Sequence, residues 1–183
     1  MDVLIIIVVL FVIIICAFWM VYAITYNKIQ DSIIRINEAE VAIDSNLRNK
    51  YDLINRAISL IKGNIENIDS KIFEEIIKLR SRKISNFDLD RKLVEASNEV
   101  IKINGEHKDL EISDELKKNI KELKIIDEKL ETLRDYYNNN ILNYNKLVKE
   151  FPTNVVARLN KYEEKLFFDK KDMTDNDEKD FKL

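Results

Sequence analysis

The sequence predicts an all-α protein in which an N-terminal transmembrane helix continues into an elongated antiparallel helical bundle. Residues 3–24 form an unbroken apolar run. The 183 residues include only two glycines and one proline, too few for the turns of a β-rich fold. Later apolar residues recur every three or four positions, as on one face of an α-helix. The expected bundle has two long helices and a shorter helical hairpin.

The apolar run predicts a retained membrane anchor over residues 1–25. As a helix, the run would be roughly 33 Å long, enough to cross a hydrocarbon core of about 30 Å. Only Met1 and Asp2 precede it, whereas a signal peptide needs a basic start and a small-residue cleavage site. Trp19, Tyr22 and Tyr26 lie at helical spacing near its far end. Such rings favour the headgroup level; three unrelated aromatic residues are the alternative.

The flanking charges predict the orientation of this anchor in the cell membrane. No Lys or Arg precedes the run, whereas Lys28 and Arg35 follow it. Basic residues stay preferentially on the cytoplasmic side. We therefore expect a single-pass protein with its N-terminus outside and its body in the cytoplasm. The sole cysteine, Cys16, lies inside the run, so no disulfide can form within one chain.

Residues 26–168 form the expected bundle. Neither glycine nor proline occurs before Gly63, so the first helix should run from the anchor to that position. The first helix has a heptad-like apolar stripe with one extra four-residue step. The stripe is Ile29, Ile33, Ile36, Ala39 or Glu40, Ile43, Leu47, Tyr51, Ile54, Ile58 and Ile61.

The hairpin and the last helices follow from capping signals. Helices are expected near 65–82 and 89–103, separated by Ser85-Asn86 and closed by a left-handed C-cap at Asn104-Gly105. Ser113 should cap a long helix over 114–150. Pro152 should end that helix, and Thr153 should cap a short one. Residues 169–183 read as a charged, disordered tail. The stripe of the long helix is Leu116, Ile120, Leu123, Ile126, Leu130, Leu133, Tyr137, Ile141, Tyr144, Val148 and Phe151.

The residues that could carry chemistry are sparse. The one histidine, His107, lies in an expected loop without an evident partner, and no zinc or phosphate-loop motif occurs. A balance of 30 basic and 33 acidic residues offers no electrostatic reason to bind nucleic acid. We therefore expect a protein that is not an enzyme and has no catalytic residues, no cofactor or metal, and no nucleic-acid partner.

Four charged residues border the apolar stripes. Arg48 and Asp52 lie on the first helix, and Asp127 and Arg134 lie one heptad apart on the long fourth helix. Antiparallel pairing would bring them to similar heights, where a shared polar layer could determine the register. Four unrelated surface charges are the alternative.

The terminal helices resemble the LemA family of bacterial single-pass membrane proteins. The similarity rests on Tyr26-Asn27, on EAEVAIDSNLRNKYDLINRAISLIKGN over 38–64 and on DEKLETLRDYYNNNILNYNKLVKEFPTNVVARL over 127–159. Glu40, Asn49-Lys50 and Asn55 depart from a tryptophan, a basic pair and a proline usual in the family. The resemblance implies a helical bundle behind one N-terminal anchor, with a small extracellular N-terminus, but no mechanism.

Matching helix lengths predicts an interaction surface at the membrane end of the bundle. Tyr and Asn side chains there combine apolar area with hydrogen-bonding groups. In the alternative they only close the bundle, and Val155, Val156 and Leu159 pack on its base or on the lipid. The candidate residues are Tyr26, Asn27, Tyr144, Asn145, Phe151, Pro152 and Asn154.

The favoured interpretation is a membrane-anchored scaffold or adaptor that acts through protein–protein interaction. Its expected partners are the lipid bilayer and unidentified proteins, with self-association as a further option. The alternative is an accessory subunit that regulates a membrane enzyme, such as an envelope protease.

Overall fold

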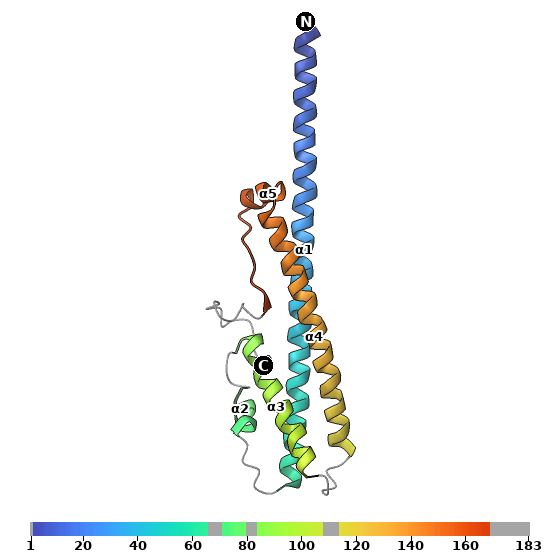
Figure 1. Cartoon of the computed structure of the whole chain (residues 1–183), viewed down its shortest axis with the longest axis vertical. Helices are drawn as coiled ribbons and strands as arrows, with labels where there is room; N and C mark the ends of the chain where they lie inside the picture. The colour runs from blue at the N-terminus through green and yellow to red at the C-terminus, as the bar shows by residue number, and fades with distance from the viewer. Residues whose placement is uncertain (1, 66–70, 80–83, 108–113, 169–183) are drawn as a thin grey trace. The chain divides into compact units, whose positions relative to one another are not determined.

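A computed structural model describes residues 2–65, 71–79, 84–107 and 114–168 of the chain. These residues form five helices and no strand (Figure 1). The predicted all-α class, with a long N-terminal apolar helix followed by a helical bundle, is confirmed. The predicted tail 169–183 and the predicted cap Ser113 lie outside the described residues. The helices are α1 (Asp2–Asn64), α2 (Lys71–Leu79), α3 (Asn86–Glu106), α4 (Asp114–Lys149) and α5 (Thr153–Leu159).

The chain divides into two compact units, each built from segments far apart in the sequence. Unit 1 contains residues 1–37 and 138–166, and unit 2 contains residues 38–137 and 167–183. Both α1 and α4 therefore contribute to both units. The predicted boundaries, after residues 25 and 168, stay predictions.

The first part of unit 1 is the apolar segment of α1. Every residue from Val3 to Val21 is exposed. Among the described residues, α1 is the one helix long and apolar enough to cross a membrane, judged by its length and composition. An apolar surface of this extent is unfavourable in water, so the segment is suited to lipid.

The rest of unit 1 has a small core built from three helices. Its buried apolar residues follow the predicted stripes of α1 and α4, and α5 adds a buried pair. Phe151 is the exception to the predicted stripe, because its side chain is 82% exposed. The core residues are Ile29, Ile36, Ile141, Tyr144, Val156 and Ala157.

Unit 2 holds the larger core, and polar contacts show how its helices are arranged. Asn119 of α4 donates from Nδ2 to the Leu53 carbonyl of α1 at 3.1 Å, and Asp127 lies beside Lys50. Residue numbers thus rise along α4 as they fall along α1, which makes the two segments antiparallel. The α2–α3 hairpin is joined by Lys92 Nζ and Glu75 Oε2 at 2.6 Å.

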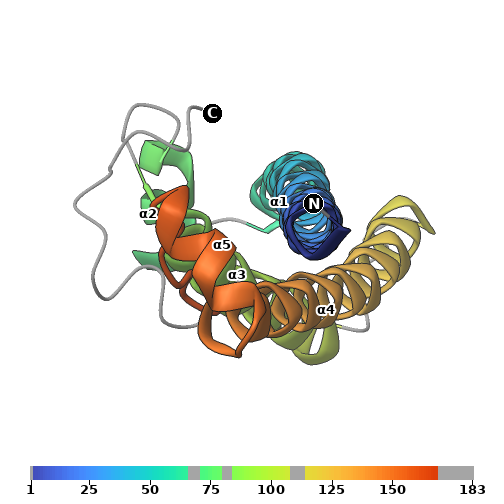
Figure 2. The same ribbon diagram turned by 90° about the horizontal axis from the view of Figure 1, so that it is seen from above.

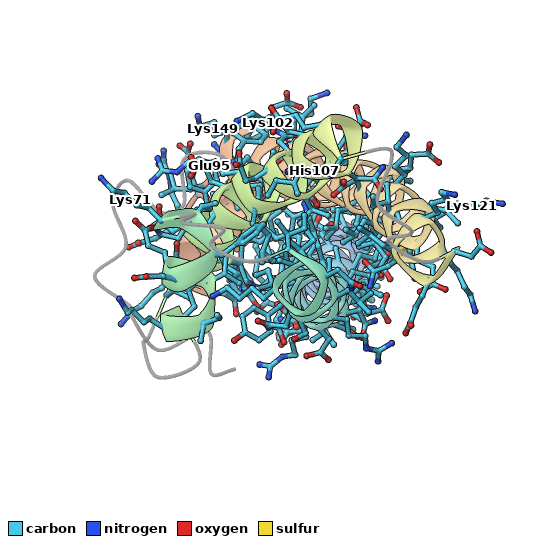
Figure 3. The ribbon with its side chains drawn as sticks, turned by 90° about the horizontal axis from the view of Figure 1, so that it is seen from below. Lys71, Glu95, Lys102, His107, Lys121 and Lys149 are labelled. Carbon is cyan, nitrogen blue, oxygen red and sulfur yellow. The ribbon has the colours of Figure 1, made fainter. Side chains whose placement is uncertain are left out.

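Most charged residues of unit 2 lie on the helix faces opposite its buried apolar residues, as helical periodicity requires; Lys50 and Asp90 are buried exceptions. The predicted stripe of α1 is buried from Ala39 to Ile61, with Ala39 rather than Glu40 in the core. Charged side chains such as Lys71, Glu95 and Lys121 are exposed and point away from the helices (Figure 3).

The helix ends test the predicted caps. Ser85 is the N-cap of α3 and accepts a hydrogen bond from the Asp88 amide at 3.1 Å, which confirms that prediction. The left-handed cap at Asn104-Gly105 was wrong. The helix continues to Glu106, and neither glycine has a positive φ. The His107 amide donates to Ile103 O, and this extra helical bond offsets the modest cost of glycine in a helix.

The predicted capping role of Thr153 was also wrong. Thr153 is the first residue of α5, and the helix has no side-chain cap. The Thr153 hydroxyl donates backwards to the Glu150 carbonyl at 2.8 Å. It therefore satisfies the exposed end of α4, which stops at Lys149 as Pro152 predicts.

Candidate functional site

An aromatic cluster lies on α1 where the apolar segment meets the rest of unit 1. The Trp19 and Tyr22 rings lie edge to face with centroids 5.9 Å apart. The Tyr22 and Tyr26 rings are stacked at 6.2 Å. Steps of three and four residues bring these side chains to one helix face, which confirms their predicted common spacing.

The chain that leaves α5 returns to this cluster. Asn160 Nδ2 donates to the Tyr22 hydroxyl at 3.2 Å. Gln30 Nε2 donates to the Tyr162 hydroxyl, which also forms a hydrogen bond with Tyr26. Helix α5 is therefore held against α1 at the end of the apolar segment (Figures 1 and 2).

A tight turn makes this return possible. Lys161 follows the C-cap of α5 with a φ of 57°. The Tyr162 amide donates to Ala157 O at 2.9 Å, and the Lys161 amide donates to Arg158 O at 3.1 Å. These two bonds form a Schellman motif, in which the left-handed position is most often glycine.

Two neighbouring residues of α4 hold the segment that follows the turn. The Tyr144 hydroxyl donates to Glu163 O at 2.9 Å. Asn145 Nδ2 donates to Lys165 O at 2.8 Å, and Asn145 Oδ1 accepts from the Lys165 amide at 2.9 Å. Lys165 Nζ lies 5.9 Å from the centre of the Tyr144 ring. This pair of side chains thus replaces the backbone partners that an extended segment otherwise lacks.

The hydroxyls of Tyr144 and Tyr162 remain protonated near neutral pH. Burial raises the pKa of Tyr144 above its ordinary value of 10.0, and the nearby Tyr162 and Glu163 raise it further. Loss of solvation also raises the pKa of Tyr162, and its hydrogen bond with Tyr26 acts in the same direction, against the opposing effect of Gln30. Both hydroxyls therefore keep their protons and can donate hydrogen bonds.

The candidate interaction residues separate into two groups. Tyr144 is buried, and Tyr26, Asn145 and Asn154 are half-buried. Exposed to solvent are Asn27, Phe151 and Pro152. The contacts of Tyr144 and Asn145 are internal to unit 1, as packing requires; partner binding at these positions stays a prediction.

The comparison with protein families supports the resemblance seen in the sequence. The model of the LemA family matches residues 39–181. The chain belongs to the LemA family. No curated protein and no solved structure matches it.

In this LemA-family chain the four residues of the predicted polar layer, Arg48, Asp52, Asp127 and Arg134, differ in their ion-pair partners and exposure, and a shared layer stays a prediction. Lys50, whose side chain is 0% exposed, lies 2.6 Å from Asp127 Oδ1. The two atoms are close enough for an ion pair, but their angles do not meet the geometry of a hydrogen bond. Arg134 reaches Asp90 on α3 at 3.0 Å. Arg48 lies 3.1 Å from Asp44 on its own helix, and Asp52 is exposed.

Geometry explains why the partners differ from the prediction. Asp127 and Arg134 are seven residues apart, a separation of about 10.5 Å along the helix. They therefore lie at different heights: Asp127 meets Lys50 of α1, and Arg134 meets Asp90 of α3. As predicted, Asp127 lies beside the part of α1 near residue 50. Its partner there is Lys50, and not Arg48 or Asp52 as predicted.

Sequence reasoning missed several residues of the site. Gln30, Asn160 and Tyr162 join α1 to the α5 turn, and Lys161 shapes that turn. One signal could have revealed Gln30: it lies four residues after Tyr26, on the same helix face. Asn160 offered a weaker signal, since Asn is common near helix C-termini.

The one histidine of the chain lies at the end of α3. His107 is the C-cap residue of α3 and is half-buried. No group of three or more His, Cys, Asp or Glu side chains that could hold a metal ion occurs among the described residues.

Proposed function

We propose that this LemA-family protein is a non-enzymatic, membrane-anchored helical scaffold or adaptor that acts through protein–protein contacts at the membrane surface. The observation that carries the proposal is the structure of unit 1. Its apolar segment continues without a break into the part of α1 that packs with α4 and α5. Hydrogen bonds to Tyr22 and Gln30 join the folded body to the end of that segment.

This construction suits a protein that keeps a helical surface at a membrane. The exposed apolar segment supplies the anchor. Unit 2 has exposed apolar side chains, including Val41 at 69% and Ile125 at 55%. We propose a cytoplasmic location for this body because Lys28 and Arg35 follow the apolar run.

Photo-crosslinking in intact cells tests the binding role. A photoreactive amino acid replaces Val41, and the matched control carries it at the exposed Lys121. We expect crosslinks to several proteins, or to a second copy of the chain, from position 41 above those from position 121. One dominant enzyme would favour the accessory-subunit alternative. Equal, weak crosslinking from both positions would contradict binding at this surface.

A further inference from the structure

Helix α5 has two unlike faces. Val156 and Ala157 are 4% and 0% exposed and belong to the core of unit 1. Val155 and Leu159, four residues apart, are 41% and 65% exposed. Phe151, four residues before Val155, is 82% exposed. Because Val155 and Leu159 are four residues apart in α5, they lie on one helix face, and Phe151 lies two residues before the start of the helix. No described part of the chain covers these exposed side chains.

The position of α5 relates this exposed face to the anchor. Asn160 follows Leu159 directly and donates to the Tyr22 hydroxyl, and Tyr22 lies inside the apolar run 3–24. In unit 1, α5 lies at the end of α4 that points towards the N-terminal part of α1 (Figure 1). Aromatic residues such as Trp19 and Tyr22 favour the headgroup level, so α5 lies at that level as well.

The charges of α5 and its C-terminal turn agree with a lipid surface. Between Thr153 and Tyr162 the chain has two basic residues, Arg158 and Lys161, and no acidic one. Both are exposed. An interfacial segment combines apolar side chains that enter the acyl boundary with basic side chains that face anionic headgroups.

We propose that the Val155–Leu159 face of α5, together with the neighbouring Phe151, is a second membrane contact that inserts into the headgroup region beside the α1 anchor. It rests on the membrane anchoring in the proposed function. The contact would hold the body at two points, so that the membrane surface restricts the tilt of unit 1 about the anchor. The sequence left open whether Val155, Val156 and Leu159 pack on the bundle base or on lipid. In this proposal Val156 packs on the base, whereas Val155 and Leu159 contact lipid.

Quenching by brominated lipids tests this contact in the full chain. The protein is reconstituted in vesicles of phosphatidylcholine and phosphatidylglycerol whose phosphatidylcholine carries bromine on its acyl chains. An environment-sensitive fluorophore is attached to single cysteines. Native Cys16 reports the anchor, whereas Leu159→Cys and Ile34→Cys are made in a Cys16→Ser background. Ile34 is the matched control because it is an exposed apolar residue of unit 1, at 54%, and lies ten residues beyond the apolar run.

We expect the label at 159 to lose fluorescence to brominated lipid, as the label at 16 does, and the label at 34 to keep it. Equal fluorescence at 159 and 34 with quenching at 16 would overturn the lipid contact and leave the anchor intact. Absence of quenching at 16 would instead contradict the membrane anchoring itself. A label at 159 that is shielded from aqueous iodide but not quenched by bromine would show that protein covers the face, which also overturns the proposal. Circular dichroism confirms that each labelled variant is folded.

Discussion

At the residue scale, Tyr144 and Asn145 show how two adjacent side chains can hold a distant segment. One hydroxyl and one amide supply three hydrogen bonds to the backbone of Glu163 and Lys165. These residues are part of the similarity to the LemA family. In the structure their groups are engaged inside unit 1, which gives a packing reason for their presence.

Removal of these bonds should reduce stability. We expect Tyr144→Phe to lower the free energy of unfolding by about 1 kcal/mol, and Asn145→Ala by roughly 1–3 kcal/mol, because it leaves two backbone groups without their partner. Thermal unfolding in detergent measures both changes. The exposed neighbour Asn143 provides the control Asn143→Ala. Unchanged melting with reduced co-purification of partner proteins would instead identify a binding surface.

A second prediction at the residue scale concerns Lys161, where a substitution should increase the free energy of unfolding. A side chain with a Cβ is strained at its φ of 57°, whereas glycine is not. Because Lys161 is exposed, Lys161→Gly should raise the free energy of unfolding by about 1 kcal/mol. Chemical denaturation compares this variant with Lys161→Ala, which keeps the Cβ and should bring no gain. A gain with alanine would show that the lysine charge, not the backbone, is unfavourable.

At the scale of elements, the apolar stripes predicted which helix faces are buried. The ion-pair partners depend instead on how far each charged side chain extends. The α1 stripe enters the core as predicted, from Ile29 to Ile61, with Ile33 half-buried. Lys50 does not belong to that stripe, yet its side chain is fully buried and ends at Asp127. A long aliphatic stem can pass along apolar surface to a charge on another helix, and periodicity contains no information about that path.

The Lys50–Asp127 pair should matter most when only one partner is removed. Asp127→Asn leaves a buried ammonium without its carboxylate. We expect a loss of roughly 1–3 kcal/mol, below the 3–5 kcal/mol of fully buried pairs, because the Asp127 side chain is 40% exposed. Adding Lys50→Met should recover part of this loss. A double-mutant cycle by denaturant unfolding measures the coupling, and simple additivity would show that the pair contributes nothing.

Helix ends were the least predictable feature of the elements. Ser85 met its prediction because the cap depends on one local hydrogen bond to Asp88. Gly105 and Thr153 did not, because each position has more than one acceptable backbone arrangement. Glycine is tolerated within a helix at a cost of about 1 kcal/mol, and a threonine hydroxyl can donate to a preceding carbonyl as readily as it caps.

At the scale of the whole molecule, the orientation of the anchor decides which partners the body can meet. The basic residues after the run favour a cytoplasmic body. In a Cys16→Ser background, Lys182→Cys places one thiol near the C-terminus. We expect a membrane-impermeant maleimide to leave this thiol unlabelled in intact cells and to label it after lysis. The same cysteine inserted after Met1 is the control and should react in intact cells. The reverse pattern would place the body outside.

The helical class, the apolar anchor-like segment and the buried helix faces could all be predicted from the sequence, because each depends on composition or on a local repeat of three to four residues. The LemA resemblance was also readable from it. The pairs of side chains that meet could be identified only in the folded chain: Asn160 with Tyr22, Gln30 with Tyr162, and Lys50 with Asp127. The turn at Lys161, which precedes the Tyr162 contact, has a left-handed conformation although the residue is not glycine. Such contacts depend on the path of the chain between distant residues, and local periodicity does not specify that path.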